Sequence, residues 1–264
     1  MKDLAERIRS TQPEAGQIAL FWLGQAGFVF KSPGGTVLYV DAYLSHSVER
    51  KFGSNWKRLM PIPILPEDVD CDWFISTHEH DDHLDVDSIP EISRNPRVRF
   101  AGPRECTAYY RSMGLPEDRW LELYSGRQAQ MGEFSLTAVF ADHGDLAPDT
   151  VGLVIEFAGL RIYHTGDTAL RPEEMQPVVD LKPQVILPCI NGAYGNLDAD
   201  TAARLVSLTD ARLAIPTHFW MFVEHMGDPW QFQKNCLQQA PQARVQWLTQ
   251  GEGMMLSASD FPQE

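Results

Sequence analysis

The chain has 264 residues, 44% of them hydrophobic and 22% charged, which is typical of a globular protein. Its formal net charge of −14 argues against a general nucleic-acid binder, because such proteins contact phosphates through lysine and arginine. No stretch approaches the ~20 apolar residues of a membrane helix, and residues 1–8 lack the apolar core of a signal peptide. We therefore expect a cytoplasmic protein that binds neither nucleic acid nor membrane.

The first third of the chain predicts one short helix and an antiparallel meander. An amphipathic pattern indicates a helix over residues 4–9, and glycine-bounded apolar runs indicate strands over residues 17–23, 28–31 and 37–40. Residues 42–66 show no clear period and contain several prolines, so we predict a long loop with at most one helical turn. Loops of this length in compact domains are usually functional.

The rest of the chain alternates between apolar runs and amphipathic segments. We predict strands over residues 72–77, 98–101, 120–123, 134–142, 151–157, 160–164, 185–188, 213–216 and 244–248, with helices over residues 86–92, 104–113, 198–208 and 230–239. The four cysteines are far apart, which favours buried thiols over disulfides. There are no repeats and no linkers, so we expect one α/β domain over residues 1–264, a four-layer αβ/βα sandwich.

A histidine-rich cluster directly follows the buried strand predicted at residues 72–77. It has the pattern His78-x-His80-x-Asp82-His83, in a chain with only eight histidines. Imidazole and carboxylate together are the ligands that borderline divalent ions prefer. Because three histidines rarely cluster by chance in such a chain, the cluster predicts a metal site.

Three further polar residues stand where predicted strands end. They are His143 after residues 134–142, Asp167 in a glycine-containing turn, and His218 after residues 213–216. Each alone could be a hydrogen-bonded residue at a strand end. Together with the cluster, they predict a metal cradle between two sheets.

These residues resemble the metallo-β-lactamase superfamily. Within it, the segment from Trp22 to Phe28, the pairs Gly35-Thr36 and Val40-Asp41, and the segments at residues 77–85 and 215–218 resemble the L-ascorbate-6-phosphate lactonase family. The match covers nearly the whole chain in the same order. The chain departs from those lactonases in its shorter length and in having an ordinary histidine ligand at position 143.

The resemblance implies two divalent ions with a shared ligand. By position, His78, His80 and His143 would hold one ion, Asp82, His83 and His218 the second, and Asp167 would bridge both. Asp41 matches an aspartate that orients a ligand histidine. The resemblance favours manganese, while the ligand types also suit zinc or iron.

These ligands predict hydrolysis by a metal-activated hydroxide, because metal binding lowers the pKa of water toward ~7. Asp82, Asp167 and His218 are the candidate catalytic residues, with Asp82 also a candidate proton shuttle. No serine nucleophile motif is present. Cys189 could approach the site, but a buried thiol is the simpler interpretation, and His164 is interpreted as structural.

The hints about the substrate are weaker. Lys57 and Arg58, with Arg50 and Lys51, lie in the predicted long loop and could bind a phosphate or carboxylate, although a solvated loop explains them equally well. Asn191 and Tyr194 are predicted to line the pocket, and His46 and His225 to lie at the surface or at the pocket rim. A small, anionic substrate and a homo-oligomer are expected.

The leading hypothesis is a lactonase or related esterase, with a phosphorylated sugar lactone such as L-ascorbate 6-phosphate as a candidate substrate. A phosphodiesterase for a small phosphodiester or cyclic nucleotide is the enzymatic alternative. A di-iron redox protein is disfavoured, because the chain has His80 at a position where proteins that resemble that class share a carboxylate. Fold alone does not choose among these substrates.

Overall fold

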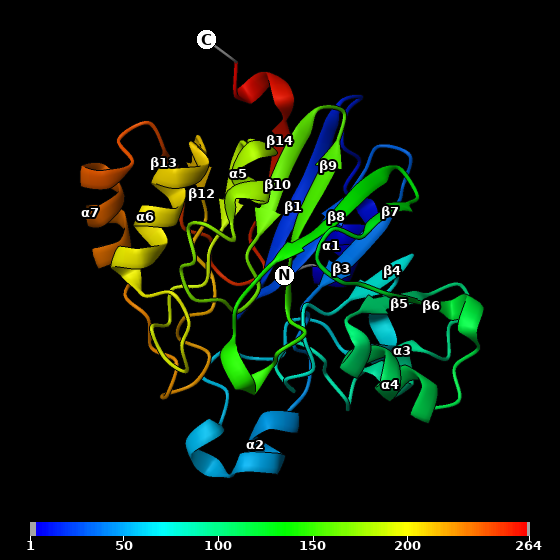
Figure 1. The fold of residues 1–264 in the computed structure, drawn as a ribbon. Coiled ribbons are helices and arrows are strands. Elements are labelled where there is room, and N and C mark those ends of the chain that lie inside the picture. Colours follow the sequence, from blue (N-terminus) through cyan, green and yellow to red (C-terminus); the bar gives the residue numbers. More distant parts are fainter. Residues whose placement is uncertain (1–3, 263–264) are drawn as a thin grey trace.

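Two seven-stranded sheets face each other in the part of the chain that the computed structural model describes, residues 4–262 (Figure 1). The first sheet has the order β14 (Gly253–Ser257), β1 (Gln17–Gly24), β2 (Gly27–Lys31), β3 (Val37–Val40), β4 (Trp73–Ile75), β5 (Arg99–Gly102) and β6 (Trp120–Glu122). The second has the order β13 (Arg244–Val245), β12 (Leu213–Ala214), β11 (Val185–Leu187), β10 (Leu160–His164), β9 (Val151–Phe157), β8 (Phe134–Phe140) and β7 (Gln128–Met131). Residues 1–3 and 263–264 of the predicted domain lie outside the described range.

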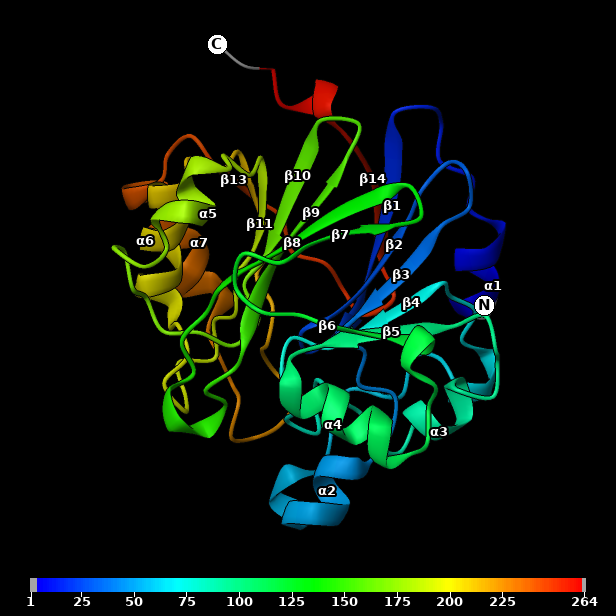
Figure 2. The same ribbon diagram turned by 45° about the vertical axis from the view of Figure 1, so that its right-hand side comes forward.

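Helices cover the outer side of both sheets (Figure 2). The second sheet is covered by α5 (Gln176–Asp180), α6 (Ala199–Thr209) and α7 (Pro229–Gln239), and the first by α1 (Leu4–Ser10), α3 (Ile89–Ile92) and α4 (Arg104–Ser112). This arrangement confirms the predicted αβ/βα sandwich. A further helix, α2 (Ser47–Phe52), lies apart from these layers at one end of the molecule (Figures 1 and 2). Among the described residues, no helix combines the length and apolar character needed to cross a membrane.

Strand β1 shows why the first sheet is apolar on both faces. Ile18, Leu20 and Trp22 belong to the large core cluster shared with the second sheet. The residues between them, including Ala19 and Phe21, pack in a separate cluster with α1, α3 and α4. Because successive side chains point to opposite faces, a strand buried on both sides reads as a continuous apolar run.

The strand directions bring the carboxyl ends of many strands to one edge of the sandwich. In the first sheet β3, β4, β5 and β6 are parallel, and β1 runs in the same direction because both β1 and β3 are antiparallel to β2. In the second sheet β10, β11, β12 and β13 are parallel, and β8 shares their direction through β9. Two backbone hydrogen bonds join the sheets at this edge, from Val151 N to Thr77 O (3.1 Å) and from His218 N to Gln25 O (3.0 Å).

Some elements differ from the sequence predictions. The predicted loop at residues 42–66 contains helix α2 and a 3-10 turn at Ser54–Trp56, separated by Gly53 at φ 92°. Strands β7 and β14 and helix α5 were not predicted. Strand β7 is an edge strand in which only Met131 is buried, so it lacks an apolar pattern. All four cysteines are free and buried, which confirms the expected thiols.

Lys31 links the first sheet to helix α1 through a buried ammonium group. Its side chain is 5% exposed, and Nζ donates to the carbonyl oxygens of Ile8 (3.0 Å) and Arg9 (2.7 Å). Helix ends leave such carbonyls without intrahelical donors.

We expect Lys31→Met to lower the free energy of unfolding by about 1–3 kcal/mol in urea denaturation, because these carbonyl oxygens lose their donor. Lys234→Met, an exposed lysine on α7, is the control, and an equal effect of both would contradict this role.

Candidate metal centre

The predicted ligand residues meet at the edge where the strand ends converge. His78, His80, Asp82 and His83 follow β4, and His143 follows β8. Asp167 follows β10 after a turn at Gly166, whose φ is 60°. Only glycine fits at this turn, because a Cβ atom there would lie 2.9 Å from the carbonyl oxygen of Val151. His218, in the left-handed region at φ 58°, follows β12. The topology therefore collects residues 140 positions apart into one cluster.

The first ligand group consists of His78, His80 and His143. Nε2 of His78 lies 3.0 Å from Nδ1 of His80, and the ligand atoms of all three lie within 4.8 Å of one another. Nε2 of His143 is 3.9 Å from Oδ2 of Asp167. This carboxylate oxygen therefore faces the first group.

The second group consists of Asp82, His83 and His218. Nε2 of His218 lies 3.3 Å from Nε2 of His83 and 3.5 Å from Oδ2 of Asp82. The other Asp167 oxygen, Oδ1, lies 3.1 Å from Nε2 of His218 and 3.4 Å from Nε2 of His83. The two oxygens of one carboxylate thus face two groups. These groups adjoin, because ligand atoms of His78, His83 and Asp167 also lie within 4.8 Å of one another.

These distances suit divalent ions. Ligand nitrogens about 2.1 Å from a tetrahedral ion lie about 3.4 Å apart, close to the spacings in both groups. Asp167 Oδ1 is buried and accepts no hydrogen bond from the described residues, as expected of an oxygen that binds a cation. The donor set of imidazole and carboxylate, without thiolate, suits manganese, iron or zinc.

Asp41 contacts the nitrogen of His83 that faces away from the second ligand group. Its Oδ2 lies 2.9 Å from Nδ1 of His83 and also accepts a hydrogen bond from the Thr77 hydroxyl (2.8 Å), while Oδ1 accepts one from Thr77 N (2.8 Å). Asp41 is fully buried at φ 46°. Asp41 therefore fixes a proton on Nδ1 of His83, and this orientation directs Nε2 at the second group, where a bound cation would take its lone pair.

The charges in the cluster favour cation binding. Burial favours a neutral Asp167 carboxyl, but His218 and His83 outweigh it and hold its pKa well below the ordinary range. Burial lowers the pKa of His78 and of His143, so both rings keep a free lone pair. Burial opposes the charged form of His218, yet Asp167 and Asp82 raise its pKa to about 9 in the metal-free protein. A bound cation would take the place of that proton.

A cavity of about 310 Å³ opens onto this cluster. The metal-binding candidates in its wall are His80, Asp82, His143 and Asp167. The remaining wall is mostly aromatic and aliphatic, with these residues: Val48, Lys51, Phe52, Trp56, Glu79, Asp81, Leu146, Tyr194, Asn196 and His225. The helix and turn that interrupt the predicted loop therefore form one side of the pocket.

Three of the four predicted substrate contacts need correction. Arg58 is 6% exposed, and its guanidinium donates to the carbonyl oxygens of Tyr43, Ser45, Met60 and Pro61, so it supports the loop instead of binding an anion. Lys57 is exposed and does not line the cavity. Asn191 lies outside the cavity wall, and its Oδ1 accepts a hydrogen bond from Asn196 Nδ2 (3.1 Å). Tyr194 does line the cavity.

Other residues reach the site without a sequence motif of their own. Asn196 Nδ2 donates to Oδ2 of Asp167 (2.7 Å), and His225 is 6% exposed and lines the cavity. Gln25, in the Trp22–Phe28 motif, donates to Oδ2 of Asp82 (2.6 Å). Gln25 belongs to a motif that carried the family resemblance. His225, predicted at the surface or the pocket rim, lies in the cavity wall, and Asn196 was not predicted.

Two residues near the centre have structural roles. Nε2 of His164 lies 2.8 Å from Ala26 O, and its Nδ1 accepts a hydrogen bond from Gly166 N, so this histidine braces the turn before Asp167. Burial raises the pKa of the Cys189 thiol to about 12, which keeps it protonated. Neither residue offers an atom to the metal-binding groups.

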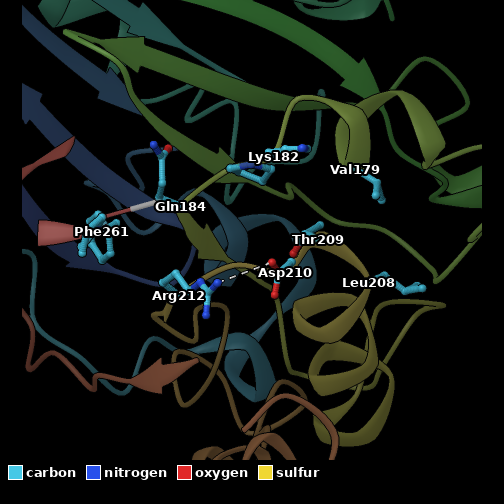
Figure 3. A pocket seen from close by; sticks show the side chains of 10 residues that line it. Val179, Lys182, Gln184, Leu208, Thr209, Asp210, Arg212 and Phe261 are labelled. Atoms are coloured by element: carbon cyan, nitrogen blue, oxygen red, sulfur yellow. Dashed lines mark ion pairs between the residues drawn. The ribbon is translucent and has the colours of Figure 1, made fainter. Parts of the chain in front are cut away.

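A second cavity, of about 390 Å³, lies near the C-terminal segment, between the ends of α5 and α6 (Figure 3). Its polar side chains are largely satisfied within the protein. Gln184 donates to Gly159 O and accepts from Arg161 N, and Arg212 pairs with Asp210 at 3.8 Å. The predicted catalytic residues are absent from its described lining.

Comparisons of sequence place the chain among known hydrolases. Residues 26–219 match the family described as Beta-lactamase superfamily domain. A UPF0173 metal-dependent hydrolase of Anaeromyxobacter dehalogenans is 30% identical over 237 residues, which cover 83% of this chain and 82% of that protein. A UPF0173 metal-dependent hydrolase of Hyperthermus butylicus is 29% identical over 235 residues, covering 88% and 96% respectively.

Solved structures at lower identity share the fold. Igni18, a metallo hydrolase from the archaeon Ignicoccus hospitalis, has a TM-score of 0.73 at 22% identity and covers 91% of this chain and 99% of its own. An isothiocyanate hydrolase from Delia radicum gut bacteria has a TM-score of 0.69 at 18% identity, covering 91% and 99%. CmlA, a diiron β-hydroxylase from Streptomyces venezuelae, has a TM-score of 0.69 at 16% identity, covering 94% and 55%.

The buried guanidinium of Arg58 generates a prediction about stability. We expect Arg58→Met to lower the free energy of unfolding by about 2–4 kcal/mol, because four carbonyl oxygens lose the hydrogen bonds that the buried guanidinium donates. Lys57→Met, at the exposed neighbouring position, should change it by less than about 0.5 kcal/mol. Chemical denaturation measures both. Equal effects would show that the carbonyl contacts do not stabilise the loop.

The raised pKa of His218 predicts how the metal-free protein responds to pH. The ordinary value is 6.5 and the value in the folded, metal-free protein is about 9, so the folded state binds this proton more tightly. The resulting stability is complete below pH 6.5 and is lost as pH rises through about 9. We expect the Tm of chelator-treated protein to fall across that interval, and to fall less in His218→Gln. Identical slopes for the two proteins would contradict the raised pKa.

Proposed function

The chain belongs to the UPF0173 metal-dependent hydrolase family of the metallo-β-lactamase superfamily, and from this we propose that it is a binuclear hydrolase of a lactone or related carboxylic ester. The observation that carries the binuclear assignment is the position of Asp167. Its two carboxylate oxygens face two different histidine groups, 3.9 Å from His143 Nε2 and 3.1 Å from His218 Nε2. One shared carboxylate between two imidazole groups is an arrangement that holds a pair of cations.

Residues of the protein would hold the ions and move a proton in the proposed reaction. His78, His80 and His143 would hold one ion, Asp82, His83 and His218 the other, with Asp167 between them. When bound, divalent ions supply a water of lowered pKa and polarise the bond under attack. We assign Asp82 as the acceptor of the proton from the attacking water, a role supported by its position in the cavity wall beside His218. Manganese, favoured by the family resemblance, is our first choice, with zinc and iron as alternatives.

The cavity wall supports a compact, mostly apolar substrate. Phe52, Trp56 and Tyr194 present aromatic surface, and Val48 and Leu146 present aliphatic surface. Lys51 is the one lysine or arginine in the described lining, and its ammonium lies 2.5 Å from Asp81. The carboxylates of Glu79 and Asp81 also lie in this wall and would repel a phosphate dianion. An uncharged or weakly charged ester therefore suits the wall better than a phosphorylated sugar lactone.

Asp167→Asn tests the binuclear assignment. The substitution keeps the shape of the side chain but replaces one of the two ligand oxygens by an amide nitrogen. We expect manganese-reconstituted wild-type protein to bind two ions per chain. The variant should bind at most one, with kcat/KM reduced more than about 100-fold. Elemental analysis measures the ions, and hydrolysis of an aryl-substituted lactone measures the rate.

Asp145→Asn, an exposed aspartate two positions after His143, is the matched control and should behave as wild type. Two bound ions with full activity in Asp167→Asn would overturn the bridging role. Parallel assays with L-ascorbate 6-phosphate and a bis-aryl phosphodiester test the substrate class. Faster hydrolysis of either than of neutral lactones and aryl esters would contradict our proposal.

A further inference from the structure

Gln25 is locked in the turn between β1 and β2. Its backbone lies at φ 51°, and its carbonyl oxygen accepts hydrogen bonds from His218 N (3.0 Å) and from the Trp22 indole (3.0 Å). The side chain is completely buried. Because two hydrogen bonds and a turn fix the backbone of this residue, its carboxamide has a defined position beside the second ligand group.

The Gln25 carboxamide connects that ligand group to His225. Nε2 lies 2.6 Å from Oδ2 of Asp82 and 3.3 Å from Nδ1 of His225, and it lies 3.2 Å from Nε2 of His218. An ionised carboxylate only accepts hydrogen bonds, so the group facing Asp82 is the amide NH₂. One hydrogen is directed to Asp82, and the second remains for His225 Nδ1 when the His218 lone pair binds a cation.

This contact determines which nitrogen of His225 carries the proton. If Nδ1 accepts from Gln25, a neutral ring carries its hydrogen on Nε2. Nε2 is buried and has no hydrogen-bond partner among the described residues. A buried N–H group without an acceptor costs free energy. Because His225 lies in the cavity wall, a ligand with an acceptor atom could satisfy this N–H group.

The ring of His225 is held by its neighbours. Its centroid lies 4.9 Å from that of His218 and 5.5 Å from that of Phe222. On the cavity side, Trp56 and Tyr194 have ring centroids at 5.2 and 5.4 Å. These two rings also line the cavity. Tyr194 is 48% exposed, so a substrate can displace its ring at a lower free-energy cost than that of Trp56.

We propose that His225 donates a hydrogen bond from Nε2 to the substrate oxygen that gains negative charge, and that Gln25 is the positioning residue that fixes this tautomer. The inference rests on the proposed hydrolytic function and adds a protein donor to it. No proton is transferred in this step, because the neutral ring would become an imidazolate. Donors aimed at developing charge in a buried site give large rate effects.

The tautomer is tested first, on zinc-loaded, histidine-labelled protein, by ¹⁵N NMR of the imidazole rings. We expect a protonated Nε2 and an unprotonated Nδ1 in His225. Gln25→Leu should lose this preference and show both tautomers. A protonated Nδ1 in the wild-type protein would overturn the inference whatever the catalytic activity.

Kinetics then test the role of the donor. His225→Phe retains a flat ring but no donor, and we expect kcat to fall about 10²–10³-fold with little change in KM and two ions still bound. Gln25→Leu should lower kcat in the same direction, and the double variant should lose little more than His225→Phe alone. His46→Phe, at an exposed histidine outside the cavity wall, should retain wild-type kcat.

The outcomes separate this inference from the proposed function. If wild-type protein with two ions hydrolyses esters and His225→Phe retains its kcat, the donor role is wrong and the hydrolase assignment stands. If His225→Phe loses bound metal, the residue is structural and the donor role is likewise wrong. If the wild-type protein hydrolyses no lactone or ester, the proposed function itself fails.

Discussion

The burial of two carboxylates among five imidazoles is the constraint on which the rest of the structure depends. Asp82 and Asp167 are less than a tenth exposed, and moving such charges out of water costs several kcal/mol each unless opposite charge or hydrogen-bond donors surround them. In the metal-free protein His218 helps to meet this need by holding a proton, and bound cations would meet it in the metal-loaded form. The site is therefore a place where protons and metal ions compete.

The scaffold and the pocket wall have different origins in the chain. The ligands follow the carboxyl ends of β4, β8, β10 and β12, and interior strands of two sheets give them little freedom. The wall comes from α2, the 3-10 turn at Ser54–Trp56, and the segments around Tyr194 and His225. Because loops can vary while the strand ends stay fixed, the same fold serves hydrolases and a hydroxylase.

Charge in the sequence is a poor guide to charge in the site. Arg58 stands in the most basic stretch of an acidic chain, yet its guanidinium is buried against carbonyl oxygens. Lys51 reaches the cavity but is paired with Asp81. Whether a cationic side chain is free to bind a ligand depends on which acceptors the folded chain places beside it. For Arg58 those acceptors are backbone oxygens, which carry no sequence signal.

The sequence by itself determined the fold class and the set of residues that meets at the candidate metal centre. Apolar periodicity placed most strands, and the histidine cluster together with His143, Asp167 and His218 identified the converging strand ends. These features are local, because a ligand motif and a buried strand are each written in a few adjacent residues. The resemblance to a known family implied that Asp41 orients a ligand histidine, and the structure places its carboxylate 2.9 Å from His83.

Only the tertiary structure decided the composition of the pocket. Asn196 and His225 have no motif, and they reach the site through loops whose course depends on packing between distant segments. The contact between Gln25 and His225 joins residues 200 positions apart, and it forms because a turn and a loop meet at the same sheet edge. Such contacts depend on which loops lie side by side, whereas the ligands depend on the strand ends that the local pattern already specifies.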